Sequence, residues 1–437
     1  MDIGTISLLI VAIMIGLMIA GVPLAWITMS LAIGCTLAWL GPAGLPLVAS
    51  RVYGFVNEYV FVAIPLFVLM ACILERSGVA RDLYDAMRLF AGNLPGGVAV
   101  QTTLVAVVMA AMTGIIGGEI VLLGLIALPQ MMRLGYDRKL AIGIICAGGS
   151  LGTMIPPSVV LIVYGLTAGV SISELFLASA LPGLLLAAFY IAYVMIRCIL
   201  NPALAPRPPR EELDIPFGQK MKLLKGLVLP ILVVIWVLGS IYGGIASVTE
   251  SAGVGALGAI IAAAARGELN FRMLRESAMR TMITVGVIIW LTLGANAFIG
   301  IYNIMGGTTY LRETIGDLPL PPFGILLVMM GILLVLGFVM DWIGICLLTM
   351  PIFVPVIKAL GYDPVWFGVL FCMNMQVSYL TPPFGPAAFY LKSVAPPEIE
   401  LHTIFSSLLP FILLQIAALL LVMLFPGIAT FLPSLMG

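Results

Sequence analysis

Long apolar stretches, separated by short polar connections, run along almost the whole chain. A helix needs about 20 apolar residues to cross the hydrocarbon core of a bilayer, and stretches of that length or slightly shorter recur throughout. The clearest are Ile6–Ala20, Val60–Leu74, Leu175–Ile196, Gly226–Tyr242, Gly253–Ala265, Ile283–Ala295, Ile325–Met340 and Phe405–Leu424. The pattern predicts an all-α polytopic membrane protein.

The composition points to the same class. Of the 437 residues, 62% are hydrophobic and only 9% are charged, whereas a soluble domain carries roughly 25% charged residues. A mean hydropathy of +1.20 exceeds what one globular core can hide, so membrane lipid is the expected surrounding. The formal net charge is zero, which leaves no basic surface for a nucleic acid. The six cysteines occur singly, so we expect small core residues rather than disulfides or metal ligands.

Two halves of the chain repeat each other at a constant offset of 226 residues. The tetrapeptide Leu-Gly-Tyr-Asp occurs at 134–137 and again at 360–363, and a Pro-Pro pair occurs at 156–157 and again at 382–383. Two related halves are typical of secondary transporters.

The repeat divides the chain into five segments. We expect N-terminal scaffold helices at 1–60, a first repeat at 61–200 with a hairpin at 93–135 and a broken helix at 139–170, a polar cytoplasmic loop at 201–225, second scaffold helices and an arm at 226–280, and a second repeat at 281–437 with a hairpin at 319–361 and a broken helix at 364–394.

The positive charges predict the topology. If the first Leu-Gly-Tyr-Asp turn faces the cytoplasm, 17 of the 20 lysines and arginines fall on that side, and only Arg51, Arg312 and Lys358 fall opposite. The positive-inside rule then places both termini outside, and the second turn outside as well. The halves are therefore expected to be inverted, with no basic side chain at the membrane midplane.

Each half contains two apolar arms of about 13–16 residues, short for a full span. The arms meet at a polar or glycine-rich point, Thr113–Glu119 in the first half and Met340–Gly344 in the second. We interpret each pair as a re-entrant hairpin with its tip near the midplane. The alternative is two ordinary spanning helices with a kink.

Acidic residues stand at both tips. Burying a carboxylate near the bilayer centre costs about 2.5–3.5 kcal/mol on insertion scales, so Glu119 and Asp341 are candidates for ion coupling or gating. The alternative is a structural carboxylate that caps the N-terminus of a hairpin helix. Glu250, in Ser-Val-Thr-Glu, is expected to cap a helix start outside the membrane.

A broken helix follows each hairpin. The breaks are expected at Gly148–Ser158 and at Asn374–Pro383, each around a Pro-Pro pair. Proline removes an amide donor and excludes the preceding residue from helical geometry. In lipid such a break is tolerated only beside a polar cavity. The freed carbonyls and nearby hydroxyls suit sodium, and half-helix N-termini suit an anion.

These residues resemble the large, DctM-type membrane subunit of tripartite ATP-independent periplasmic (TRAP) transporters. The resemblance covers nearly the whole chain and rests on Ala63–Leu69, Gly92–Gly97, Leu151–Ser158, Ala295–Phe298, Met340-Asp341 and Leu380–Pro383. One departure is the first tip, where Ile115, Ile116 and Glu119 stand in place of the Gly-Ser-Ser and small residues common in that family.

The resemblance implies an elevator-type fold and sodium-coupled uptake of a small organic anion across a bacterial inner membrane, with both termini periplasmic. It also implies two partners, a small DctQ-type membrane subunit and a DctP-type periplasmic binding protein that delivers the substrate. Sodium is the coupling ion, and no cofactor and no enzymatic activity are expected.

The candidate site residues lie at the tips and breaks. Expected sodium ligands are Gly114, Gly118, Glu119, Gly149, Ser150, Thr153, Pro156, Asp341, Ser378, Thr381 and Pro382. Expected substrate contacts are Gly117, Pro157, Ser158, Asn296, Asn374, Gln376 and Pro383.

Two other classes of membrane protein are the alternatives. A self-sufficient sodium–anion symporter of the same superfamily would need no binding protein. A membrane-embedded enzyme would need a nucleophile–base pair, a HExxH motif or facing aspartates, and the sequence has none of these. A P-loop is also absent, so ATP does not drive transport in this chain.

The inverted topology predicts one-sided chemical labelling. In a background without native cysteines, a cysteine at position 210 should react with an impermeant maleimide only from the cytoplasm, because it lies in the basic loop. A cysteine at position 317 should react only from the periplasm. Reaction of both positions from the same side would contradict the inverted arrangement.

Overall fold

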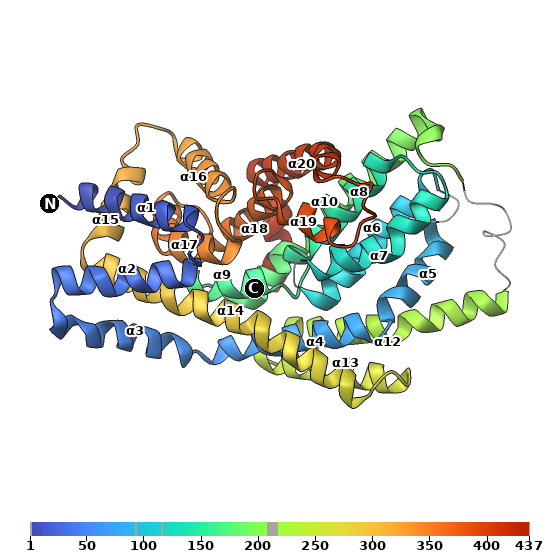
Figure 1. Ribbon diagram of the computed structural model, residues 1–437, viewed down its shortest axis with the longest axis horizontal. Helices are drawn as coiled ribbons and strands as arrows, with labels where there is room; N and C mark the ends of the chain where they lie inside the picture. The colour runs from blue at the N-terminus through green and yellow to red at the C-terminus, as the bar shows by residue number, and fades with distance from the viewer. Residues whose placement is uncertain (1, 92–93, 115–116, 208–216, 437) are drawn as a thin grey trace.

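Every regular element that the structure contains is a helix (Figure 1). The computed structural model describes residues 2–91, 94–114, 117–207 and 217–436, and no strand occurs within these ranges. Within the described residues, six helices are long and apolar enough to cross a membrane, namely Tyr59–Arg76, Ile172–Leu200, Val248–Ala265, Phe271–Ile304, Trp342–Ala359 and Leu401–Leu424. The prediction of an all-α polytopic membrane protein is confirmed.

The first half of the chain forms ten α-helices: α1 (Ile3–Ile19), α2 (Leu24–Trp39), α3 (Leu45–Val56), α4 (Ala63–Arg76), α5 (Val79–Ala91), α6 (Gly97–Thr113), α7 (Gly118–Arg133), α8 (Arg138–Ser150), α9 (Val159–Ala168) and α10 (Ile172–Leu200). The second half forms α12 (Phe217–Tyr242), α13 (Val248–Ala265), α14 (Phe271–Ile304), α15 (Gly307–Gly316), α16 (Pro322–Leu336), α17 (Trp342–Ala359), α18 (Pro364–Leu380), α19 (Pro386–Lys392), α20 (Leu401–Leu424) and α21 (Gly427–Ser434). A shift of 226 residues carries α1–α10 onto α12–α20, with α3 and α4 together corresponding to the single helix α14.

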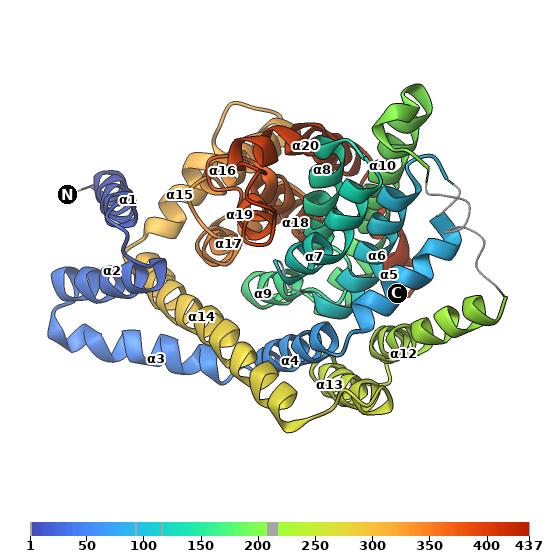
Figure 2. The same ribbon diagram turned by 45° about the vertical axis from the view of Figure 1, so that its right-hand side comes forward.

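The helices form two groups (Figures 1 and 2). One is a layer of α2, α3, α4, α12, α13 and α14 along one side of the molecule, and the other contains the hairpins, the broken helices, α10 and α20. Within the layer, equivalent helices pack crosswise, because α14 packs on α2 just as α4 packs on α13. The same helix α14 also contacts α17, so it connects the layer to the second hairpin.

The repeated Leu-Gly-Tyr-Asp turn joins two helices by the same local chemistry in both halves. Gly135 and Gly361 follow the ends of α7 and α17 with φ of 77° and 80°, a left-handed conformation that glycine adopts without strain. Asp137 then accepts a hydrogen bond from the Leu140 amide at 2.9 Å, and Asp363 caps α18 in the same way. The tetrapeptide therefore ends one helix and starts the next.

The two turns lie at opposite ends of α10. The amide of Asp137 donates to the Leu204 carbonyl at 2.8 Å, just beyond the C-terminus of α10. The second turn is followed by Pro364, whose carbonyl accepts a hydrogen bond from the Tyr164 hydroxyl at 2.6 Å. Gly368, one turn later, packs against Leu175 at the beginning of α10.

Three predicted boundaries need correction. Helix α12 already begins at Phe217, inside the predicted loop 201–225, because no proline follows until Pro230. Helix α14 runs without interruption through the predicted boundary at 280–281, since no proline lies between its two ends. Helix α18 continues to Leu380, because Pro382 excludes the residue before it, Thr381, from helical geometry. Thr381 is extended, with ψ of 132°. Residues 208–216 of the predicted loop and 115–116 of the first tip lie outside the described residues.

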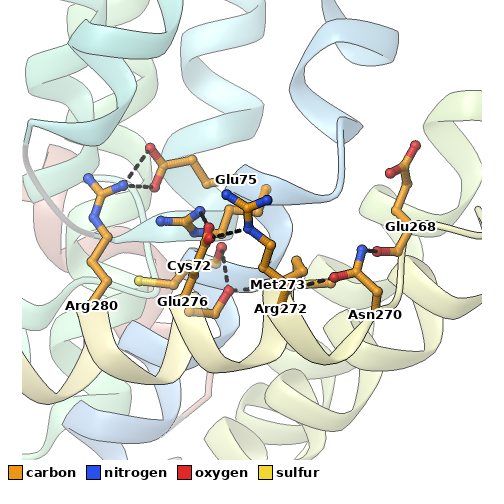
Figure 3. A network of polar contacts seen from close by, with 10 residues as sticks. Cys72, Glu75, Glu268, Asn270, Arg272, Met273, Glu276 and Arg280 are labelled. Atoms are coloured by element: carbon orange, nitrogen blue, oxygen red, sulfur yellow. Dashed lines mark hydrogen bonds and ion pairs between the residues drawn. The ribbon is translucent and has the colours of Figure 1, made fainter.

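Ion pairs join the beginning of α14 to the end of α4 (Figure 3). Glu276 lies 2.6 Å from Arg76 and 2.9 Å from Arg272, and Arg280 lies 3.1 Å from Glu75. Exposed pairs of this kind contribute little to stability because water screens them. Their main consequence is positional, because they hold the charged end of α14 beside α4.

The crossing of α8 and α20 generates a stability prediction. A Cβ at Gly143 would lie 2.7 Å from the Ser407 carbonyl oxygen and 2.8 Å from Phe411 Cδ2. Because the two helices are already in contact, Gly143→Ala should cost about 1–3 kcal/mol. Thermal denaturation of the detergent-solubilised protein measures this as a lower Tm.

The matched control is Gly286→Ala on α14. No atom lies within 4 Å of the added Cβ at that position, so alanine should be neutral or stabilise by up to about 1 kcal/mol through its helix propensity. Equal losses of Tm in the two variants would contradict the close crossing.

Candidate functional site

Both hairpin tips and both helix breaks meet in one region. The Val159 amide, at the start of α9, donates to the Gly114 carbonyl at the first tip at 3.2 Å. The two broken helices contact each other directly, because Gln376 Nε2 donates to the Ser150 carbonyl oxygen at 3.0 Å. Positions 150 and 376 are related by the 226-residue offset, so equivalent residues of the two halves touch here.

The first tip holds a deeply buried carboxyl group. Glu119, in the first turn of α7, is 1% exposed, and its Oε1 is hydrogen-bonded to the Thr113 hydroxyl. Its Oε2 has no hydrogen-bond partner in the described chain. Gly152 of the first break lies so close that a Cβ there would be 2.9 Å from Glu119 Oε1. The carboxyl group thus faces both the hairpin and the first break.

The second tip has a different carboxylate geometry. Asp341 is the N-cap of α17, and its Oδ2 accepts a hydrogen bond from the Ile343 amide at 3.2 Å. The capping interpretation of this residue is therefore confirmed. The predicted cap at Glu250 is confirmed as well, since Ser247 and Glu250 form a capping box at the start of α13.

A chain of cavities connects the two tips. The largest, of about 440 Å³, lies between the tips and α14 and is lined by Val68, Gly114, Val159, Val160, Ile283, Thr284, Val287, Ile288, Leu291, Asp341, Trp342, Ile343, Tyr379, Phe384, Pro386 and Tyr390. A cavity of about 240 Å³ beside the first tip shares Thr284 and Tyr390 with it. A small cavity of about 20 Å³ beside the second tip shares Asp341 and Tyr379.

Three helix N-termini lie at these cavities. The first residues of α9 and α17 line the large cavity, and those of α7 line the neighbouring one. Each N-terminus presents backbone amides without an intrahelical partner and acts as about half a positive charge, although the Val159 amide is bonded to Gly114 and the Ile343 amide to Asp341. The arrangement can therefore accommodate an anion in a region that is largely apolar.

The sequence analysis missed two charged side chains at this site. Arg280 and Glu75 line the cavity beside the first tip together with Thr113 and Glu119, and they form an ion pair (Figure 3). The positive charges predicted no basic side chain at the membrane midplane, and they gave no indication that Arg280 lines this cavity. Because α14 begins at Phe271, Arg280 lies more than two turns inside a helix, where its long side chain reaches the hairpin. Its position where the charged beginning of α14 passes into the apolar part of the helix was the available signal.

Most of the predicted hydroxyl residues gather at the breaks. Ser150, Thr153 and Ser158 are buried, and their hydroxyls donate to the carbonyls of Ala147, Ser150 and Thr153 respectively. In the second break Thr381 Oγ1 donates to the Val377 carbonyl at 2.6 Å. Each hydroxyl oxygen keeps lone pairs that could bind a cation.

The glycines and prolines of the prediction shape the same region. Gly117 packs against the Tyr390 ring, Gly118 lies beside Glu75, and Gly149 packs against the backbone of Ile120. The peptide bonds Pro156-Pro157 and Pro382-Pro383 are both cis.

Some predicted residues lie elsewhere or are engaged with other helices. The Asn296 amide donates to the Arg51 carbonyl of α3 at 3.1 Å and lines a separate pocket with Glu58, so it does not join the tips and breaks. Asn374 is buried and donates to the Met330 carbonyl of α16 at 2.7 Å. Ser378 lines the small cavity beside Asp341.

Comparison with known proteins gives a match along almost the entire chain. The model of the family described as "Tripartite ATP-independent periplasmic transporter, DctM component" matches residues 11–428. The C4-dicarboxylate TRAP transporter large permease protein DctM of Pseudomonas aeruginosa is 30% identical over 411 residues, 92% of each chain. The ectoine TRAP transporter large permease protein TeaC of Halomonas elongata is 29% identical and covers 98% of this chain and 99% of its own. The sialic acid TRAP transporter large permease protein SiaM of Vibrio cholerae is 28% identical and covers 96% of this chain and 97% of its own.

Two solved structures share the fold. The YdaH transporter of Alcanivorax borkumensis superimposes with a TM-score of 0.64 at 16% identity, over 95% of this chain and 98% of that one. MtrF of Neisseria gonorrhoeae superimposes with a TM-score of 0.62 at 17% identity, over 89% of this chain and 85% of that one.

The contact between the first tip and the first break can be tested by hydrogen exchange. Gly114 has φ of 57°, and a Cβ on it would collide with the Pro157 carbonyl oxygen. Gly114→Ala should therefore break the hydrogen bond from the Val159 amide and speed exchange in the peptide containing Val159 at least tenfold. Gly169→Ala is the control, because Gly169 has a similar φ of 64° and no neighbour within 4 Å. Unchanged exchange at Val159 in the Gly114 variant would contradict the contact.

Proposed function

Because this chain belongs to the DctM component family of tripartite ATP-independent periplasmic transporters, we propose that it carries a small organic anion inward across the bacterial inner membrane, driven by sodium. Membership of this family makes the chain the large permease subunit of a bacterial membrane transporter. It also implies a small membrane subunit and a periplasmic binding protein as partners. The match with tripartite systems does not favour the alternative of a self-sufficient symporter.

One observation carries the proposal: two hairpin tips and two helix breaks surround a single set of cavities. A backbone break deep in a membrane protein is tolerated where it lines a polar site. Here three helix N-termini, the carboxyl groups of both tips and the Ser378 hydroxyl line the cavities, and they come from both halves of the chain. Such a site can bind a cation and an anion side by side.

Sodium is proposed to bind at the two tips. Each tip offers a carboxyl group, Glu119 or Asp341, next to the carbonyls and hydroxyls of the adjoining break. These oxygens are the hard ligands that sodium requires. At the first tip, the unpartnered Oε2 of Glu119 is available to replace the hydroxyl ligands that the tip lacks.

The movement is proposed to be that of an elevator. The group with the hairpins and broken helices would carry the site across the membrane, while the layer around α14 stays fixed. The large cavity supports this division, because it lies between the two groups, with α14 on one wall and the tips on the other. The placement of the two repeated turns at opposite ends of α10 supports an inverted repeat, with both termini in the periplasm.

The decisive experiment is uptake by the complete tripartite system in proteoliposomes. Uptake should rise steeply with external sodium and collapse when potassium replaces sodium. Undiminished uptake from sodium-free buffer under an intact proton gradient would refute sodium coupling.

Thr381→Val tests the second break, since it removes a hydroxyl while keeping the side-chain shape. We expect the apparent sodium affinity to fall roughly tenfold or more, and uptake to be slower. The reason is that one contact between a hydroxyl oxygen and a charged group contributes about 1.5–3 kcal/mol. Thr167→Val is the control, since Thr167 makes the same i−4 hydrogen bond but lies near the C-terminal end of α9, away from both Pro-Pro pairs. Equal effects in both variants would contradict a sodium role for Thr381.

A further inference from the structure

The walls of the large cavity are unusually aromatic for a site that is to hold a small organic acid. Trp342, Tyr379, Phe384 and Tyr390 all line it, and the remaining walls are mostly valine, isoleucine and leucine. The rings of Tyr379 and Tyr390 are stacked, with centroids 6.4 Å apart and planes 25° from parallel. Phe384 and Tyr390 keep 38% and 42% of their surface exposed although they line the cavity. Open aromatic surface of this kind favours an apolar or aromatic ligand.

The polar groups lie mainly at one end. Thr284 and Tyr390 connect the large cavity to the one that holds Arg280. Arg280 is the only lysine or arginine among the residues that line the three cavities within the described chain. Because Glu75 pairs with it at 3.1 Å and Glu119 lines the same cavity, a ligand carboxylate there is balanced only together with the sodium ions of the proposed function. A second carboxylate, further along the ligand, would face apolar walls or the like charge of Asp341. The charge pattern therefore favours a ligand with a single carboxylate.

A second observation points to a ligand independently of the cavity's shape. The Tyr379 hydroxyl has no hydrogen-bond partner in the described chain, although the side chain is only 8% exposed and lines two of the cavities. A buried hydroxyl without a partner is costly. A ligand in the large cavity could supply the missing hydrogen bond.

The size of the cavity is sufficient. An apolar cavity of about 150 Å³ can already hold benzene, and this one measures about 440 Å³. It therefore has room for a ring together with a short chain bearing a carboxylate.

Building on the proposed transport function, we propose that the substrate is an amphipathic monocarboxylate. Its carboxylate lies toward Arg280 and Thr284, within reach of the Tyr379 hydroxyl, and its ring-sized apolar body lies against Trp342, Phe384 and Tyr390. This substrate class differs from the C4-dicarboxylates named for one relative.

The test is calorimetric titration of the purified membrane complex, this chain with its small subunit, in sodium buffer. The probes are phenylacetate, an aromatic monocarboxylate, and succinate, a dicarboxylate of similar length. We expect saturable, sodium-dependent binding of phenylacetate and at least tenfold weaker binding of succinate. Tyr379→Phe should weaken phenylacetate binding roughly tenfold, because the lost hydrogen bond is to a charged or polar ligand group. Tyr53→Phe is the control, since Tyr53 is 71% exposed on α3.

The outcomes separate this inference from the proposed function. If succinate binds in a sodium-dependent way and phenylacetate does not, the substrate class is wrong and the sodium-coupled site stands. If phenylacetate binds equally well to wild type and to both Tyr379→Phe and Trp342→Leu, it occupies another place and the inference is overturned. If neither carboxylate binds with or without sodium, both the substrate class and the proposed anion site are refuted.

Discussion

A polypeptide in lipid must satisfy its own backbone hydrogen bonds, because hydrocarbon offers neither donors nor acceptors. An unbroken helix satisfies these hydrogen bonds most simply, and the two Pro-Pro pairs interrupt the helix at two equivalent places. The structure compensates by bringing the breaks against the hairpin tips and against each other. The bond from the Val159 amide to Gly114 and that from Gln376 to Ser150 are direct results.

Glycine is what allows the compensation to occur at such short range. Gly114, Gly149 and Gly152 each face a backbone or a carboxyl group that a larger residue would displace. A larger residue would also be too close at the α8–α20 crossing, where Gly143 lies against a backbone carbonyl. At these positions glycine therefore allows close approach of helices.

The sequence predicted those features that depend on local chemistry. The helix class, the caps at Asp341 and Glu250 and the locations of the breaks follow from apolar length, proline and capping residues. The sequence predicted less well those features that depend on tertiary contacts. The orientation of Asn296 toward α3 and the reach of Arg280 to the first tip depend on how α14 is rotated and placed among its neighbours. A one-dimensional pattern does not contain that rotation.

The contact between Ser150 and Gln376 also has a historical consequence. In a dimer of two identical chains, a residue on the symmetry axis meets its own copy, so it must be compatible with itself. Once two copies are joined in one gene, that requirement disappears and each copy can change alone. Here one position is a short hydroxyl residue and the other is a long amide that reaches across to its backbone. The centre of the molecule, where the two halves meet, is thus a place where they are chemically different.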